Sequence, residues 1–178
     1  IGGRPLSFTS RLRSRQDVRA RTLSSFNPQD ERQDRVYELA LRYEPPSQSF
    51  AFEAGRIGIS RFVGIGYLDG ALFRFQVAPG LHLGAFGGQR ADPDGLEPGG
   101  HGPKYGAFVG LAPGGRWARS WEVVLAGVRE MASGDVSREY LSVESRFGGG
   151  SRWNLYQRGE VDWNRGWRLE ASNGRAFQ

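Results

Sequence analysis

The side chains that could do metal or acid–base chemistry are few and scattered. His82 and His101 are the two histidines, and the absence of cysteine excludes disulfides and thiolate metal sites. Two isolated histidines do not make a zinc site. Asp92, Asp94 and Glu97 could offer oxygen ligands to Ca²⁺, but they lack EF-hand spacing. We therefore predict no metal site and no cofactor, and an exposed acidic loop around these carboxylates.

The sequence also lacks a recognisable motif for nucleophilic catalysis. A serine hydrolase brings a serine, a histidine and a carboxylate together, and Ser120, Ser142 and Ser145 are available serines. None of them lies in a Gly-x-Ser-x-Gly elbow. The glycine-rich stretch GIGYLDG (64–70) precedes a predicted strand and lacks the lysine and helix of a phosphate loop. We expect no catalytic residues and no enzyme.

The charged residues are mostly arginine and glutamate. Of 24 basic residues only Lys104 is a lysine, and the formal net charge is +5. The arginines are spread singly through alternating segments instead of forming a basic patch, so we predict no nucleic-acid partner.

The elements that carry these charges are predicted to be strands. Short turn signals recur evenly along the chain, at 44–48, 78–80, 112–116 and 148–151. Longer, irregular connections are predicted between them, near 18–33, 61–68, 88–103, 131–135 and 163–166. Short turns at one end and long loops at the other are typical of an up-and-down β-barrel.

Between the turns, apolar and polar residues alternate with the period of a β-strand. Residues 35–44 and 69–78 are examples, and 116–131 is predicted to be a strand although it has apolar residues on both faces at 123–125. The phase of 50–60 changes near Gly55, which indicates a bulge.

The stretch RWNLYQRGEVDWNRGW (152–167) indicates how long such a strand is. Trp153 and Trp163 end its apolar face, and ten residues of strand span about 33 Å. A tilt of about 40° reduces this to a height of roughly 25 Å, the apolar band of a transmembrane barrel. Aromatic residues at both edges of the band would lie at the membrane–water interfaces.

The alternation divides the candidate residues between two faces of the sheet. The membrane-facing candidates are Tyr37, Tyr43, Phe73, Phe75, Trp153 and Trp163. The lumen-facing candidates are Arg42, Arg74, Glu144, Arg146, Arg152, Arg158 and Glu160. Arg74 and Arg152 have no neighbouring acid on the same face of their own strands, so they could form a positive constriction that favours anions.

The sequence also resembles a known class of protein. The segments EAGRIGIS (53–60) and GIGYLDGALFRFQVAPGLHLGAFGGQRADPDGLEP (64–98) resemble uncharacterised porin-like outer-membrane β-barrels of Gram-negative bacteria. The resemblance covers roughly residues 35–175 and implies an outer-membrane location, a passive or structural role and no catalytic residues. Such barrels usually end on an aromatic residue, whereas Gln178 follows Phe177 here, which suggests a segment of a longer barrel.

The expected fold is therefore all-β, an antiparallel up-and-down meander of about ten strands that forms a transmembrane β-barrel or part of one. We expect one domain over 1–178, with an edge strand at 5–16, a loop at 18–33 and a hairpin meander over 34–174. The expected function is a passive pore or structural barrel in contact with outer-membrane lipid. It could pass small solutes with a weak preference for anions, and its oligomeric state stays open. The alternative is a soluble β-barrel or sandwich that binds a small ligand in its interior, since both classes give the same alternation.

Overall fold

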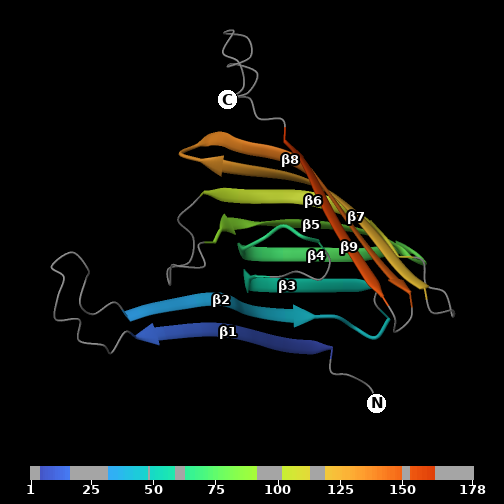
Figure 1. Ribbon diagram of the computed structural model, residues 1–178, viewed down its shortest axis with the longest axis horizontal. Helices are drawn as coiled ribbons and strands as arrows, with labels where there is room; N and C mark the ends of the chain where they lie inside the picture. Colours follow the sequence, from blue (N-terminus) through green and yellow to red (C-terminus); the bar gives the residue numbers. More distant parts are fainter. Residues whose placement is uncertain are drawn as a thin grey trace, which may run out of the picture.

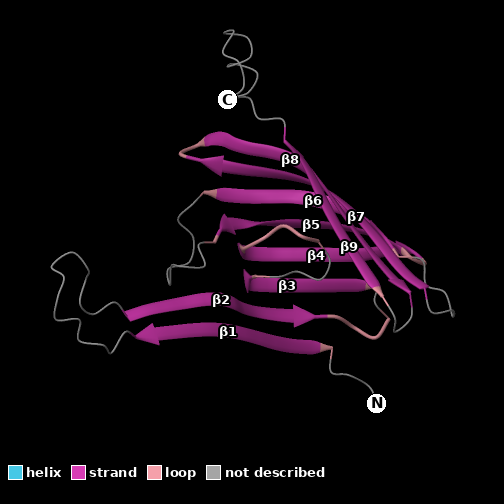
Figure 2. Ribbon diagram, in the orientation of Figure 1, coloured by secondary structure: helices cyan, strands magenta, loops and turns pink. Residues whose placement is uncertain are grey.

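The computed structural model describes residues 5–16, 32–47, 49–58, 63–91, 102–112, 119–149 and 153–162. Within these ranges nine strands form one sheet (Figure 1), and every element drawn is a strand or a loop (Figure 2). The strands are β1 (Leu6–Gln16), β2 (Arg32–Tyr43), β3 (Phe50–Ile57), β4 (Leu68–Ala78), β5 (Leu81–Arg90), β6 (Pro103–Leu111), β7 (Arg119–Ala132), β8 (Asp135–Gly149) and β9 (Asn154–Asp162). The described part contains no helix that is long and apolar enough to cross a membrane.

The strand order in the sheet follows the order in the chain. Each strand from β1 to β9 pairs antiparallel with its sequence neighbour. The predicted all-β antiparallel meander is therefore confirmed, and the described part of the ambiguous segment 116–131, from Arg119, is a strand, β7. In the described part the sheet is open, with β1 and β9 at its edges.

The connections differ from the prediction at two places. The long loop predicted at 131–135 is wrong, because β7 and β8 are joined by a tight turn at Ser133 and Gly134, whose φ angles are 51° and 88°. Two consecutive left-handed residues suit the right-handed twist of a hairpin. The bulge predicted at Gly55 is also wrong: this residue has a φ of +116°, but the pairing of β3 with both neighbours continues through it without a shift of register.

The sheet curves around a packed core. Val63 and Ile65, from the connection between β3 and β4, are each 2% exposed and belong to one buried cluster with Val128 of β7 and Tyr140 of β8. Strands that are distant in the sheet therefore approach each other on one face, which we call the inner face. In Figure 1, β9 accordingly crosses in front of the strands in the middle of the sheet.

The opposite, outer face is mostly apolar and largely exposed. Many of its large hydrophobic side chains are between 36% and 66% exposed. They are Leu6, Phe8, Leu39, Leu41, Tyr43, Phe73, Phe75, Val77, Leu83, Tyr105, Leu111, Trp121, Leu125, Val143, Leu155 and Val161. Successive side chains of a strand point to opposite faces, so the residues that flank each of these hydrophobic residues in the sequence point to the inner face.

Candidate functional site: the charged inner face and the apolar outer face

Four of the six aromatic candidates are exposed. Tyr43, Phe73 and Phe75 lie on the outer face, and Trp153 directly precedes β9. Three of these rings are in a cluster around Phe50, whose ring centroid is 5.2 Å from that of Phe75 and 6.3 Å from that of Tyr43. The sheet therefore carries an aromatic cluster over β2, β3 and β4, beside the connection at 44–49 and near the turn at 79–80.

Tyr37 is half-buried, and Trp163 lies outside the described residues. The pairing of β1 with β2 shifts register between Arg11 and Leu12, close to Tyr37. The guanidinium of Arg11 lies 5.8 Å from the centroid of the Tyr37 ring, a cation–π distance. This tyrosine therefore packs against an arginine at the register shift in the middle of the β1–β2 pair.

The inner face carries buried carboxylates that contact arginines. Arg42 of β2 contacts Glu38 at 2.5 Å within its own strand and Glu53 of β3 at 3.2 Å. The side chain of Glu53 is fully buried. Removing a carboxylate from water is costly unless a partner of opposite charge or hydrogen bonds compensate it, so the contact with Arg42 offsets part of the cost of burying Glu53.

A second group joins three neighbouring strands, β7, β8 and β9. Arg146 of β8 contacts Glu144 at 2.6 Å and Glu122 of β7 at 3.4 Å. Its guanidinium also lies 5.9 Å from the ring of Tyr156 on β9. Glu144 is 4% exposed, so this predicted lumen residue is buried on the inner face.

Arg74 has an acidic partner that its own strand does not supply. Its Nη2 atom lies 3.2 Å from Glu44, which follows β2 at the start of the β2–β3 connection. Arg152, the other arginine of the predicted positive constriction, lies outside the described residues. The charge of Arg74 is therefore balanced across strands.

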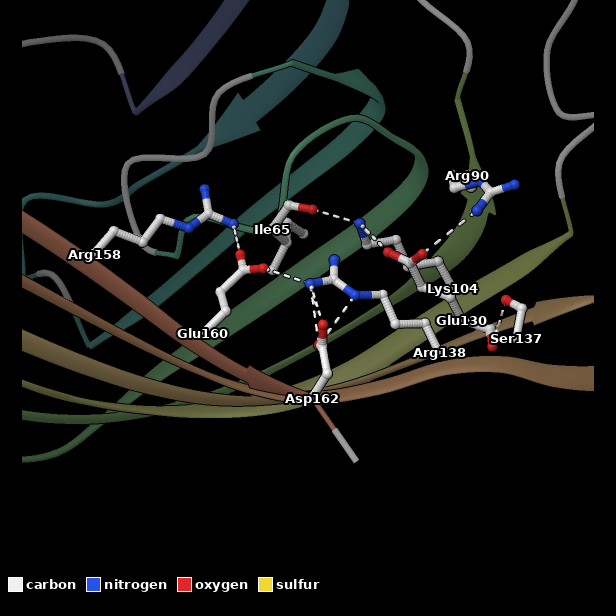
Figure 3. Close-up of polar contacts among 9 residues, drawn as sticks. All are labelled: Ile65, Arg90, Lys104, Glu130, Ser137, Arg138, Arg158, Glu160 and Asp162. Atoms are coloured by element: carbon white, nitrogen blue, oxygen red, sulfur yellow. Dashed lines mark hydrogen bonds and ion pairs between the residues drawn. The ribbon is translucent and has the colours of Figure 1, made fainter. Parts of the chain in front are cut away.

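A third group of charged side chains lies on the inner face where β8 begins and β9 ends (Figure 3). Arg138 of β8 contacts Glu160 at 2.6 Å and Asp162 at 3.0 Å, both on β9. Arg158 also forms an ion pair with Glu160. Two predicted lumen residues, Arg158 and Glu160, are thus brought together, and Arg138 and Asp162 complete a network that strand-by-strand reasoning missed.

The sequence analysis also missed residues 63–67, which we call the inner segment because it lies on the inner face. Lys104 of β6 donates a hydrogen bond of 2.5 Å to the carbonyl oxygen of Ile65 and forms an ion pair of 2.8 Å with Glu130 of β7 (Figure 3). Gly64 lies against Glu144: a Cβ built on it would be 2.5 Å from a carboxylate oxygen. The alternating apolar and glycine residues of this stretch, Val-Gly-Ile-Gly, are its only signal in the sequence.

The outer face has polar exceptions, and the side chains there contact each other. Arg56 of β3 and Asp69 of β4 face each other with two hydrogen bonds of 2.8 Å. Arg129 of β7 donates a hydrogen bond of 2.6 Å to Glu139 of β8. Both pairs lie toward the ends of the strands at which β3, β5 and β7 terminate, so the apolar area has a polar border on that side.

A third exception lies within the apolar area itself. Ser145 of β8 faces Gln157 of β9 in the pairing and donates a hydrogen bond of 3.4 Å to its side-chain oxygen. Mutual bonding reduces the cost of placing polar groups in an apolar environment.

The candidate catalytic and metal residues do not form a centre in the described part. No group of three or more His, Cys, Asp or Glu side chains there could hold a metal ion. Ser142 is buried on the inner face, whereas Ser145 lies on the outer face. The side chain of Ser120 lies outside the described residues, as do His101 and the acidic stretch at 92–97.

No protein-family model matches this chain, and no curated protein or solved structure matches it either.

Proposed function

We propose that this chain forms the wall of a β-barrel in the outer membrane of a Gram-negative bacterium, where it acts as a passive pore or structural barrel. The observation that carries the proposal is the exposed apolar outer face. Monomeric soluble proteins rarely expose contiguous apolar patches larger than a few hundred Å². An exposed apolar face on the convex side of a curved sheet is suited to contact with the hydrocarbon of a membrane.

The height of the apolar face supports the same proposal. On β4 its outer positions run from Asp69, in the polar border, to Val77 beside the turn. Eight residues of strand span about 27 Å, and a tilt of about 40° reduces this to a height of roughly 20 Å. The apolar band of a transmembrane barrel is about 25 Å tall, with aromatic girdles at its edges. The cluster around Phe50 is suited to such a girdle.

The inner face supports a passive role. Its charges are paired across strands, as in Arg42 with Glu53 and Arg74 with Glu44, so fixed charge of either sign is largely balanced. The chain as a whole has a formal net charge of +5. We therefore propose a weak preference for anions and no strict selectivity.

The proposal requires that the barrel be closed. Hydrocarbon cannot satisfy the free N–H and C=O groups of an edge strand, so the outer edges of β1 and β9 must be paired in the membrane.

The alternative, a soluble β-barrel or sandwich with a ligand in its interior, would place the apolar face inside. Its discriminating test is detergent dependence. The membrane barrel should aggregate without detergent and should insert into lipid vesicles, where it resists extraction at high pH. A chain that stays monodisperse in detergent-free buffer would contradict the membrane location.

The pore itself is tested by reconstitution into a planar bilayer under a salt gradient. We expect ohmic conductance with a small reversal potential of the anion-selective sign. Insertion without any conductance would leave a structural barrel, and a reversal potential of cation-selective sign would contradict the anion preference.

A further inference from the structure

The inner segment is held by the only lysine of the chain. All other basic residues are arginine, yet Lys104 occupies the position that contacts both the inner segment and the sheet. Its Nζ atom donates to the Ile65 carbonyl oxygen at 2.5 Å and lies 2.8 Å from Glu130 Oε1 (Figure 3). Lysine is a compact point charge with three donors on a flexible stem, so it can satisfy a carbonyl and a carboxylate that lie in different directions.

The inner segment is shaped to meet this lysine. Gly66, directly after Ile65, has a φ of +71°, a conformation that glycine adopts without strain. Gly64 brings the backbone close to Glu144 and to Arg158, on β8 and β9. Val63 and Ile65 are each 2% exposed in the inner core. The segment therefore extends across the inner face, from the strands that it connects to strands on the far side of the sheet.

We propose that Lys104 is a positioning residue that fixes the inner segment on the inner face, and that release of its contact with the Ile65 carbonyl frees the segment. If the chain is a pore, as proposed above, the inner segment obstructs it and Lys104 sets how far it is open. Only this second part rests on the proposed function. The first part concerns the fold alone and can be tested separately.

Hydrogen exchange tests the first part on the full chain. In Lys104→Met the backbone amides of 63–67 should exchange at least about tenfold faster than in the wild type, because the segment opens locally more often. Arg90→Met is the matched control: Arg90 lies 3.5 Å from the other oxygen of Glu130, and in Figure 3 its dashed line leads to Glu130, whereas the line to Ile65 comes from Lys104. It removes the same charge and should leave exchange at 63–67 unchanged. Equal exchange in Lys104→Met and the wild type, or equally faster exchange in both variants, would overturn the proposal.

Chemical rescue separates positioning from a general loss of folding. The chain contains no cysteine, so Lys104→Cys introduces a unique thiol. Alkylation with 2-bromoethylamine in denaturant, followed by refolding, rebuilds a lysine-like ammonium at this position. Protection at 63–67 should return to the wild-type level with this group and should stay low after alkylation with iodoacetamide, which adds a neutral amide. Recovery with both groups or with neither would overturn a role of the charge.

Conductance then tests the second part. Lys104→Met should show a larger single-channel conductance than the wild type, and Arg90→Met should match the wild type. A wild-type chain that inserts but does not conduct contradicts the pore, whereas the exchange experiments still decide the role of Lys104. Conductance that is unchanged in Lys104→Met although exchange at 63–67 is faster would overturn the obstruction alone.

Discussion

The ring of Phe108 lies directly over Gly84, the residue opposite it in the pairing of β5 and β6. A Cβ built on Gly84 would be 2.1 Å from the Cζ atom of that ring, closer than real atoms approach. The same pairing sets Phe86 opposite Gly106 and His82 opposite Gly110. Each of these aromatic or imidazole rings occupies the space over the glycine opposite it. This explains why glycines alternate with larger residues on the inner face of β5 and β6.

The first prediction follows from this contact. Gly84→Ala should lower the free energy of unfolding by about 1–3 kcal/mol, the usual cost of overpacking, because the ring of Phe108 must move. Gly127→Ala on β7 is the control, since a Cβ there meets nothing within 4 Å. It should change stability by less than about 1 kcal/mol, and a small gain is possible because alanine restricts the unfolded chain. Denaturant titration of both variants in the same detergent measures the difference. Equal losses would show that the ring does not need the space over Gly84.

The second prediction concerns the pair formed by Arg56 and Asp69 on the outer face. Their side chains are 6% and 11% exposed and share two hydrogen bonds, so Arg56→Met would remove both of these bonds from a buried carboxylate. Breaking one side of a buried ion pair costs about 3–5 kcal/mol. Arg129→Met breaks the comparable pair with Glu139, where the arginine side chain is 46% exposed, and should cost less than about 1 kcal/mol. Unfolding midpoints of the two variants, converted with a common m-value, compare them. A loss for Arg56→Met as small as that for Arg129→Met would contradict the burial of this pair.

The third prediction separates a lipid-facing wall from a water-facing one. Leu125 is the middle outer residue of β7, between Trp121 and Arg129, whereas Val77 lies beside the turn at 79–80. In vesicles Leu125→Arg should cost about 2–4 kcal/mol and Val77→Arg about 0–1 kcal/mol, because the cost of a charge falls toward the interface. Reversible unfolding by denaturant in lipid vesicles measures both.

A water-facing sheet would behave differently in the same experiment. Exposed substitutions on a soluble surface usually change stability by less than about 0.5 kcal/mol at any position. Two equally small losses would therefore favour the soluble alternative over the membrane barrel.

The parts of the fold that depend on local periodicity could be predicted from the sequence. Alternation with period 2 was enough to separate Phe73 and Phe75 from Arg74, because in a strand the face of a side chain follows from its position alone. The antiparallel meander followed from regularly spaced turn signals. The tight turn at Ser133 and Gly134 was missed because a serine in the left-handed region is uncommon and gives a weak turn signal.

The contacts across strands could not be predicted in the same way. Arg74 had no neighbouring acid on the same face of its own strand. Its partner Glu44, which follows β2, is brought within 3.2 Å by the pairing of β2 with β3 and of β3 with β4. The inner segment was predicted to be a connection, which it is, but its inward position was missed because periodicity does not say which connection turns inward. Lys104 was noted only as the exception among arginines, and its role depends on Ile65, which is 39 residues away in the sequence.

The last prediction concerns the ion pair of Arg74 and Glu44, where the proposed anion preference can be tested with two opposite substitutions. In the open pore Arg74→Gln removes a positive charge and leaves Glu44, whose side chain is 28% exposed, without this partner. The reversal potential under a salt gradient should then move toward cation selectivity. Glu44→Gln removes the negative charge and should move the reversal potential toward anion selectivity, because fixed charge offsets the cost of dehydrating an ion of opposite sign.

Both shifts of the reversal potential should shrink at high salt, where exposed charges are screened over about 3 Å at 1 M ionic strength. The double variant should return close to the wild-type potential if the two charges act on the same part of the path. Two single variants that both keep the wild-type potential would place this pair away from the path of the ions, whatever the conductance of the pore.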